Sequence, residues 1–395
     1  MIDYTYYALL LVIFVLSFGA YFLLRKRLNY SQTLVLMITG IVMGSIRFGN
    51  DFLINIPDNL LYSIAVLSVV IYLFNFATRI NIKQFEIHFP ESFRMSFIFL
   101  GTSLVFLSAL AYFIFGIRSV MLCLIFASAV SGTFLTRQIK EQMDHVEKKR
   151  IVKILDHEAV LSTIIAFVVS FIFIDFVINV DYSEMFQDFL LASVPFLRSI
   201  LVGAGIGFII AVISFRFIRK IEHNAFPPVI LFFLAVAIFI VSFFLGGNYV
   251  IGIAVFGLFF ANAHIKDKKY FYDHSDFVSK IFEFALPLFA GIYIRSYLNF
   301  SFILKSSFIF FLFLVLRYFS ISLILKKKRL DFGKKLYLTL CPEISMAAPA
   351  VALFILSTFL QTEWLTKTAS VILLFVLFSS IISEAVKRIE AKFLG

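Results

Sequence analysis

Charge is scarce in this chain. Only 15% of its 395 residues are Asp, Glu, Lys or Arg, whereas 61% are hydrophobic. Soluble globular proteins carry about 25% charged residues, so this composition excludes a soluble fold. The two cysteines, Cys123 and Cys341, both lie inside apolar stretches. They therefore define no disulfide framework, haem attachment site or zinc cluster. The composition predicts an all-α polytopic membrane protein.

Apolar windows long enough to cross a hydrocarbon core of about 30 Å are frequent. The long ones lie near residues 7–24, 60–77, 96–115, 159–179, 197–215, 228–245, 302–325, 336–360 and 366–386. Shorter or glycine-interrupted windows lie near residues 32–46, 119–135, 249–263 and 281–294. We therefore predict about 13 transmembrane helices. They form one transmembrane transporter domain over residues 1–395, without a soluble regulatory domain.

The basic residues alternate between rich and poor connections. Their numbers in successive connections, ending with the C-terminal tail, are 3, 1, 3, 1, 6, 1, 3, 0, 4, 1, 6, 1 and 3. The positive-inside rule assigns the rich connections to the cytoplasm, which places the N-terminus outside and the C-terminus inside. Rich and poor connections together contain 33 of the 35 basic residues. The excess of positive charge is thus topological, and we expect a lipid bilayer and no nucleic acid as partner.

Two crossings are interrupted by small residues, polar residues and prolines. They are FASAVSGTFL (126–135) and CPEISMAAPAVAL (341–353). In secondary transporters, interrupted crossings at corresponding positions of two halves mark an ion site, because unwound backbone supplies carbonyl oxygens and helix-dipole ends. If the first crossing is set aside, the remaining twelve form two halves of six. The first interruption is in the fourth crossing of the first half, and the second is in the fifth crossing of the second half. We predict an inverted-repeat transporter fold with two broken helices.

Ionisable residues inside the crossings are few. Each costs roughly 2.5–3.5 kcal/mol at a helix centre, so each is a functional candidate. Arg317 and Glu343 both lie roughly 12 Å from the predicted cytoplasmic surface, and we predict that they form an ion pair. The alternative for Arg317 is that its side chain reaches out to that surface. Asp175 and Lys305 approach the outer surface and are interpreted as interfacial charges.

Glu158 lies at the start of an apolar crossing, in KILDHEAVLST (153–163). Glu158 and Ser162 are one helical turn apart and share a face, so a carboxylate and a hydroxyl can bind one ion together. A small cation requires oxygen ligands, and a desolvated carboxylate can instead hold a proton. The alternative is that Glu158 is a juxtamembrane acid whose charge is balanced by Lys153 and Arg150. Exchange of proton and cation at one carboxylate is the first hypothesis.

Four polar or charged residues in two stretches of the chain complete this candidate site. Ser131 and Thr133, in the first interrupted crossing, lie in the same predicted cytoplasmic half of the membrane. Asp156 and His157 precede the carboxylate at the expected water boundary. His157 is a candidate pH sensor because histidine changes its charge near neutral pH.

Several stretches resemble the cation:proton antiporter superfamily, the prokaryotic sodium/proton exchangers. They are LVLMITGIVMGSI, YLFNFATRINIKQF, SAVSGTFLTRQIKEQMDHVEKKRIVKILDHEAVLST, GIAVFGLFFAN, FALPLFAGIYIRSYL, LVLRYFS and PEISMAAPAVAL. Their order and spacing along most of the chain carry the resemblance. It implies an elevator-like alternating movement, a homodimer, and a prokaryotic cytoplasmic membrane crossed many times. It also implies a transporter, not an enzyme.

The resemblance assigns roles to particular positions. It makes Thr133 the threonine of the first unwound segment and Glu158 the glutamate of a Gly-Glu-Ser step. It makes Arg317 the basic residue of the eleventh crossing and Glu343 the acid of the second unwound segment. The family's ion site would therefore lie among these residues.

The chain departs from the family pattern at its two hallmark aspartates. Phe134 stands where an Asp is expected, and Ser162–Thr163 stands where an Asn-Asp pair is expected. A shifted alignment would instead set Asp156–His157, or His157 and Glu158, on the acidic step of other branches. Loss of both aspartates favours a second hypothesis, a homologue without antiport activity that serves as a structural or regulatory membrane partner.

The first hypothesis is exchange of one monovalent cation, sodium or potassium, for one proton. Glu158 is the exchangeable carboxylate, and Arg317 with Glu343 supports the site electrostatically. The neutral oxygen ligands are Ser131, Thr133, Ser162 and Thr163. No cofactor is expected, and no metal beyond the transported cation. A third hypothesis is transport of another solute, such as an organic anion drawn to Arg317.

Overall fold

The computed structural model describes residues 17, 19, 21–22, 30–48, 51–52, 54, 56–80, 89–135, 148–179, 187–218, 228–263, 268–294, 299–328, 331–358 and 362–389. These residues are almost entirely α-helical. The helices are α2 (Gln32–Gly44), α3 (Asp58–Ala77), α5 (Phe89–Phe115), α6 (Val120–Val130), α8 (Lys148–Asn179), α9 (Gln187–Ile218), α10 (Pro228–Phe244), α11 (Tyr249–Asn262), α12 (Lys268–Ile294), α13 (Phe300–Ile324), α14 (Phe332–Leu340), α15 (Ala347–Ser357) and α16 (Glu363–Arg388). A short antiparallel hairpin, β1 (Arg47–Phe48) and β2 (Asp51–Phe52), follows α2.

The helices coincide with the predicted apolar windows. In the described part of the chain, 7 helices are long and apolar enough to cross a membrane, and shorter apolar helices lie in the remaining windows. Window 336–360 is formed by α14 and α15 together. Window 7–24 lies almost entirely outside the described residues. The predicted all-α membrane fold is confirmed, whereas the orientation of the termini stays a prediction.

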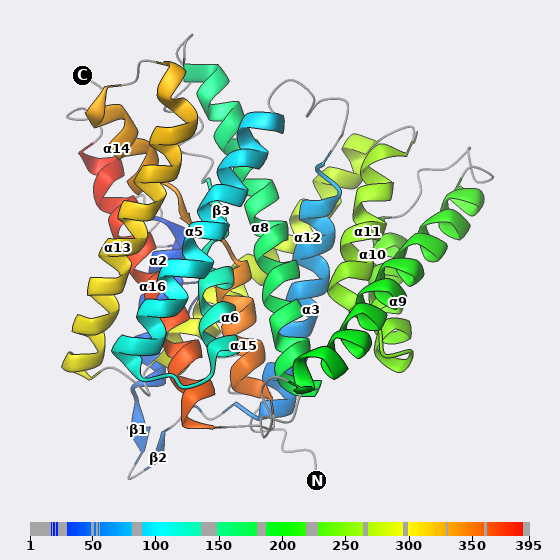
Figure 1. Cartoon of the computed structure of the whole chain (residues 1–395), viewed down its shortest axis with the longest axis horizontal. Coiled ribbons are helices and arrows are strands. Elements are labelled where there is room, and N and C mark those ends of the chain that lie inside the picture. The colour runs from blue at the N-terminus through cyan, green and yellow to red at the C-terminus, as the bar shows by residue number, and fades with distance from the viewer. Residues whose placement is uncertain are drawn as a thin grey trace.

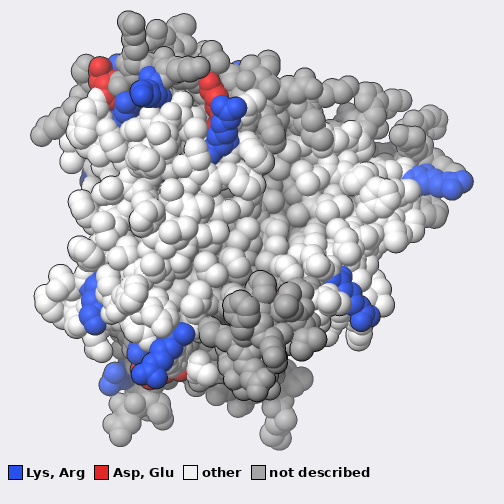
Figure 2. Space-filling view, in the orientation of Figure 1, with Lys and Arg blue, Asp and Glu red and all other residues white. Residues whose placement is uncertain are grey.

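The helices differ in how deeply they lie in the bundle. In Figure 1, α9, α10 and α11 lie together at the right of the view, and α13 and α16 at the left. The apolar window of α16 is 72% buried, whereas that of α9 is only 22% buried. On the face shown in Figure 2, a broad uncharged area lies between charged side chains near the edges of the view. An apolar exterior of this kind fits lipid, which solvates apolar side chains.

The most enclosed helix is α15. Its sequence AAPAVALFILS is apolar on every side, which is typical of a helix that is surrounded by others. It packs against α3, α8 and α16, and most of its side chains are fully buried. Small residues in its first turn let neighbouring backbones come close. This helix follows directly on the second interrupted segment.

The two interrupted segments cross each other. Helix α6 ends at Val130 and is followed by the extended β3 (Thr133–Phe134). Helix α14 ends at Leu340 and is followed by β4 (Glu343–Ile344) before α15 begins. The strands pair antiparallel, with Thr133 opposite Ile344 and Phe134 opposite Glu343. The second interruption has a helix on each side and is a broken helix, as predicted. The first is described only as far as residue 135, so a helix that resumes beyond it stays a prediction.

Local chemistry explains this crossing. Pro342 lacks the backbone N–H that would donate within a continuing helix, which favours a break between α14 and α15. The backbone N–H of Ser345 donates to the carbonyl oxygen of Gly132 at 2.9 Å. A Cβ atom at Gly132 would collide with the Ser345 side chain. The close approach of the two segments therefore requires glycine at this position.

Candidate functional site

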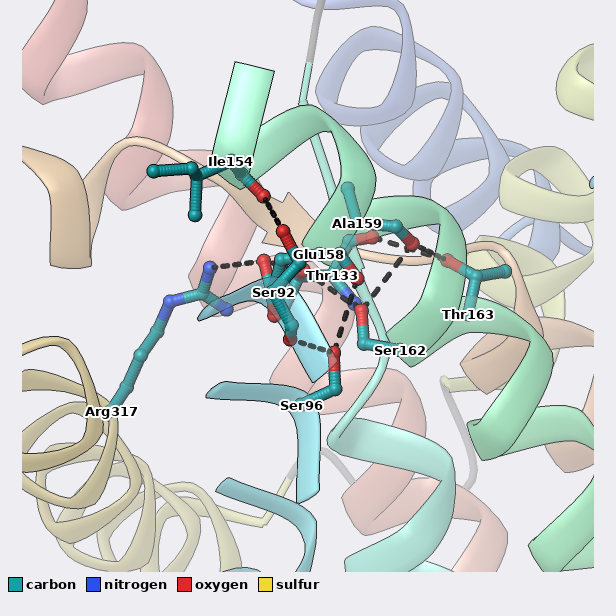
Figure 3. A network of polar contacts seen from close by, with 9 residues as sticks. All are labelled: Ser92, Ser96, Thr133, Ile154, Glu158, Ala159, Ser162, Thr163 and Arg317. Atoms are coloured by element: carbon teal, nitrogen blue, oxygen red, sulfur yellow. Dashed lines mark hydrogen bonds and ion pairs between the residues drawn. The ribbon is translucent and has the colours of Figure 1, made fainter. Parts of the chain in front are cut away.

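Glu158 lies in the interior of the bundle, with 1% of its surface exposed. The Thr133 hydroxyl donates a hydrogen bond of 2.9 Å to Glu158 Oε2. Arg317 Nη2 lies 3.9 Å from the same oxygen. Side chains from α8, β3 and α13 thus meet at one carboxylate (Figure 3). The juxtamembrane interpretation of Glu158 is wrong, because the helix turns this side chain away from the surface.

Thr133 is held by α8 through each of its polar groups. Its backbone N–H donates to Ser162 Oγ at 3.2 Å, and the two hydroxyl oxygens are 3.1 Å apart. The Thr163 hydroxyl donates to the Thr133 carbonyl oxygen at 3.1 Å. Glu158 and Ser162 share one face of α8, as their one-turn spacing predicted, and both contact Thr133 of the unwound segment. The result is a buried cluster of carboxylate, hydroxyl and carbonyl oxygens.

Arg317 is fully inside the protein, with 3% of its surface exposed. Its guanidinium carbon lies 5.6 Å from the centre of the Phe99 ring. In the described part of the chain, Nε and Nη2 make no hydrogen bond, and Glu158 is the acidic partner within ion-pair distance. The interpretation that Arg317 reaches out to the surface is wrong, because Glu158 offers a buried opposite charge.

The predicted ion pair between Arg317 and Glu343 does not form. Glu343 is buried in β4, and its Oε1 lies 3.7 Å from Lys387 Nζ. Equal depth suggested the pair, but depth does not specify the direction in which a side chain points. Glu343 in β4 faces Lys387 of α16, and Arg317 forms its ion pair with Glu158. Lys387 is one of the three basic residues of the predicted C-terminal tail.

Ser131 is not brought to the carboxylate. It is buried, and its hydroxyl donates to the Ser128 carbonyl oxygen at 2.7 Å. Asp156 and His157 are half-buried in the turn of α8 that precedes Glu158. Buried residues of α8 also precede them, so their position at a water boundary and a role of His157 in pH sensing stay predictions.

The two remaining charges differ from each other. Lys305 on α13 is exposed, as expected for an interfacial residue. Asp175 is half-buried, and its Oδ2 accepts a hydrogen bond of 2.6 Å from Asn248 Nδ2. Asn248 caps the N-terminus of α11. Asp175 is therefore more than an interfacial charge, because it joins α8 to α11.

A bundle of membrane-length helices whose two interrupted segments cross beside a buried ion pair is a secondary transporter by architecture. The chain belongs to the sodium/hydrogen exchanger family. The family model "Sodium/hydrogen exchanger, transmembrane" matches residues 12–388. The predicted resemblance is thereby confirmed, and with it the class of a transporter, not an enzyme.

The fold is similar to that of solved structures of one archaeal protein, the sodium proton antiporter MjNhaP1 from Methanocaldococcus jannaschii. Its structure at pH 8 has a TM-score of 0.74 and 15% sequence identity, over 98% of this chain and 100% of that chain. A structure from an electron-microscopy map has a TM-score of 0.69 and 16% sequence identity, over 100% of this chain and 97% of that chain. A search among curated proteins found no match. At this identity the similarity establishes the fold alone.

Proposed function

We propose that this protein exchanges a monovalent cation, sodium or potassium, for protons across a prokaryotic cytoplasmic membrane. Membership of the sodium/hydrogen exchanger family supports exchange of this kind. The observation that carries the proposal is the buried carboxylate of Glu158, which lies among hydroxyl oxygens at the crossing of the two interrupted segments.

Glu158 is the exchangeable carboxylate in this proposal. A desolvated carboxylate binds either a proton or a cation that has lost its water. Thr133 and Ser162 supply the first neutral oxygens, because their hydroxyls lie next to each other and one of them contacts Glu158 Oε2. A hydroxyl can donate or accept, so Thr133 can turn its proton towards Ser162 and present a lone pair to a cation.

Arg317 supplies a fixed balancing charge. With a proton or a monovalent cation on Glu158, the pair carries the same net charge. One proton then moves against one cation without net charge transfer. We expect that clamping the membrane potential at zero leaves the initial rate of sodium-driven proton movement unchanged, and a rate that follows the potential would contradict this stoichiometry.

The wider architecture completes the proposal. The crossing of β3 and β4 and the helices around it move as one core against the rest of the bundle, which alternates the access of Glu158 between the two sides. The two halves form an inverted repeat, the N-terminus lies outside and the C-terminus inside, and two copies assemble into a homodimer. The basic connections on one side of the membrane and the family resemblance support these assignments.

The test is substitution Glu158→Gln in purified protein reconstituted into liposomes. A pH-sensitive dye inside the liposomes reports proton movement after addition of sodium or potassium outside. We expect the wild type to respond and Glu158→Gln to lose the response. Glu363→Gln is the matched control. Glu363 is an exposed acid in the first turn of α16, and it pairs with Lys367 on the same helix. An undiminished response in Glu158→Gln would overturn the proposal.

The alternative is a homologue that does not exchange ions. It is favoured by Phe134 and Thr163 at the positions of the expected aspartates. Thr163 lacks a charge, and its hydroxyl is bonded to the carbonyl oxygens of Thr133 and Ala159. A wild-type protein that moves no protons with either cation would support this alternative. An organic anion is disfavoured as substrate, since the guanidinium of Arg317 already faces Glu158.

A further inference from the structure

A second group of charges lies inside the bundle, on the other side of the crossing from Arg317. Lys387 Nζ lies 3.7 Å from Glu343 Oε1 and 3.8 Å from Glu384 Oε2. Glu384 is already engaged, because it accepts the backbone N–H of Ser31 at 3.0 Å and lies 3.3 Å from Arg388 Nε. Glu343 is also hydrogen-bonded by the side chains of Ser31 and Thr33, and Lys387 supplies the opposite charge at its other oxygen, Oε1.

The contact between Glu343 and Lys387 is an attraction of charges without a hydrogen bond. Their side chains are 2% and 7% exposed. Glu343 Oε1 and Lys387 Nζ make no hydrogen bond with any group in the described part of the chain. Partly satisfied buried charges are costly, and a site that retains them commonly uses them.

One face of α16 follows the second interrupted segment. Ser379, Ser383 and Lys387 are spaced by four residues and therefore line up on one side of the helix. Ser379 Oγ accepts the backbone N–H of Ile344 at 3.2 Å. The Ser383 hydroxyl donates to the Cys341 carbonyl oxygen at 2.6 Å. Lys387 faces Glu343, which lies between Cys341 and Ile344 in the chain.

These contacts lead directly to the candidate ion site. Glu343 and Ile344 form β4, and Ile344 is paired with Thr133 in β3. Thr133 in turn donates to Glu158. A change in the position of β4 therefore moves the Thr133 hydroxyl relative to the carboxylate. Glu384 holds the end of α16 against the N-terminus of α2, which gives Lys387 a fixed reference.

We propose that Lys387 is a positioning residue for ion exchange: through Glu343 it sets the position of β4, and thereby that of the Thr133 hydroxyl at Glu158. This inference rests on the proposed function of Glu158. Lys387 itself does not touch the transported ion. Its charge draws the second interrupted segment onto α16, and the strand pair passes this position on to the first.

The experiment compares four variants of the full-length protein in liposomes: Lys387→Met, Lys387→Arg, the double variant Glu343→Gln/Lys387→Met, and the control Lys367→Met. Lys367 lies on the same helix and pairs with Glu363 at 2.6 Å in an exposed position. For each variant, the apparent KM for sodium and the maximal rate per folded protein are measured, together with the melting temperature in detergent.

We expect Lys387→Met and the double variant to raise the apparent KM by about tenfold, because misplacement of a ligand by a fraction of an ångström weakens binding. Lys387→Arg should stay within about twofold of the wild type, since it restores the charge. Lys367→Met should leave KM unchanged. The double variant leaves no unpaired buried charge, so it carries the test if Lys387→Met does not fold.

An unchanged KM in the double variant would overturn the inference, even if its melting temperature falls, because that result describes a purely structural residue. Failure of the proposed function is a separate outcome. If Glu158→Gln transports normally, Glu158 is not the exchanging carboxylate, yet the KM of the Lys387 variants is still measured in protein that contains Glu158. The two proposals thus fail on different variants.

Discussion

Two buried acids in the described part of the chain, Glu158 and Glu343, each face an opposite charge, and their surroundings differ. The carboxylate of Glu158 shares one oxygen between the Thr133 hydroxyl and the Arg317 guanidinium. The carboxylate of Glu343 faces Lys387 through an oxygen that accepts no hydrogen bond in the described part of the chain. Hydroxyl groups lie beside both acids. In the described part of the chain, Arg317 faces one acid, whereas Lys387 faces Glu384 as well as Glu343.

This difference suggests a division of labour. Neutral hydroxyls can exchange their hydrogen bonds for contacts with a cation, so the surroundings of Glu158 suit binding and release. Glu343, Lys387 and Glu384 form a cluster of three charges, which resists such an exchange and suits a fixed position. The strand pair of β3 and β4 links the two, with Thr133 at one end and Glu343 at the other.

The sharpest way to break this comparison is to neutralise each acid in turn. We expect Glu158→Gln to lower the rate of sodium-driven proton movement by more than about a hundredfold, because no exchangeable carboxylate remains. Glu343→Gln should raise the apparent KM by about tenfold and retain transport. Dye measurements in liposomes compare the two. Equal losses in both variants would show that the acids do not have separate roles.

Removal of the buried arginine tests the cost of the first pair. Arg317→Met leaves Glu158 buried without its opposite charge, which should lower the free energy of unfolding by roughly 3–5 kcal/mol. The double variant Glu158→Gln/Arg317→Met should recover most of this loss, since it buries no charge at this point. Thermal melting in detergent measures both. A melting temperature of Arg317→Met equal to that of the wild type would contradict the structural role of the pair.

A smaller effect is expected at the hydroxyl that donates to Glu158. Thr133→Val removes the hydrogen bond to Glu158, and a bond to a charged group contributes about 1.5–3 kcal/mol. The apparent KM for sodium should therefore rise by at least about tenfold, whereas Thr133→Ser keeps the hydroxyl and should remain close to the wild type. If valine transports with the KM of threonine, this hydroxyl is not a ligand.

The smallest effect should come from an exposed pair on α16. Lys367 and Glu363 lie 2.6 Å apart at the protein surface. Exposed pairs of this kind stabilise by less than about 1 kcal/mol. Glu363→Gln should therefore change neither transport nor the melting temperature beyond one or two degrees. A large loss would mean that any charge on α16 matters, which would remove the contrast with Lys387.

Much of the fold could be predicted because hydropathy is a local property. The windows that predicted α3, α8 and α16 contain long apolar runs, and their ends carry the charged residues. The interruptions could also be predicted, since small residues, polar residues and Pro342 occur together in a few consecutive positions and disfavour a continuous helix. The shared helix face of Glu158 and Ser162 followed from their one-turn spacing, whereas their contact with Thr133 is visible only in the structure.

The partners of the buried charges could not be predicted in the same way. Depth placed Arg317 and Glu343 at one level, but their directions depend on the rotation of α13 and on the crossing of β4. Lys387 was assigned to a tail because it lies at the end of a helix, whereas the helix turns its side chain inwards. Ser131 shares the unwound segment with Thr133, yet its hydroxyl is bonded back to α6.

The sequence by itself determined that the chain enters the membrane, where its helices lie and which of them break, because each of these depends on a few consecutive residues and their transfer from water to lipid. Only the tertiary structure decided which acid meets which base. Arg317 pairs with Glu158, and Lys387 with Glu343, because the crossing of two extended segments orients these side chains. Pairing in the interior depends on directions in space, and no local pattern encodes them.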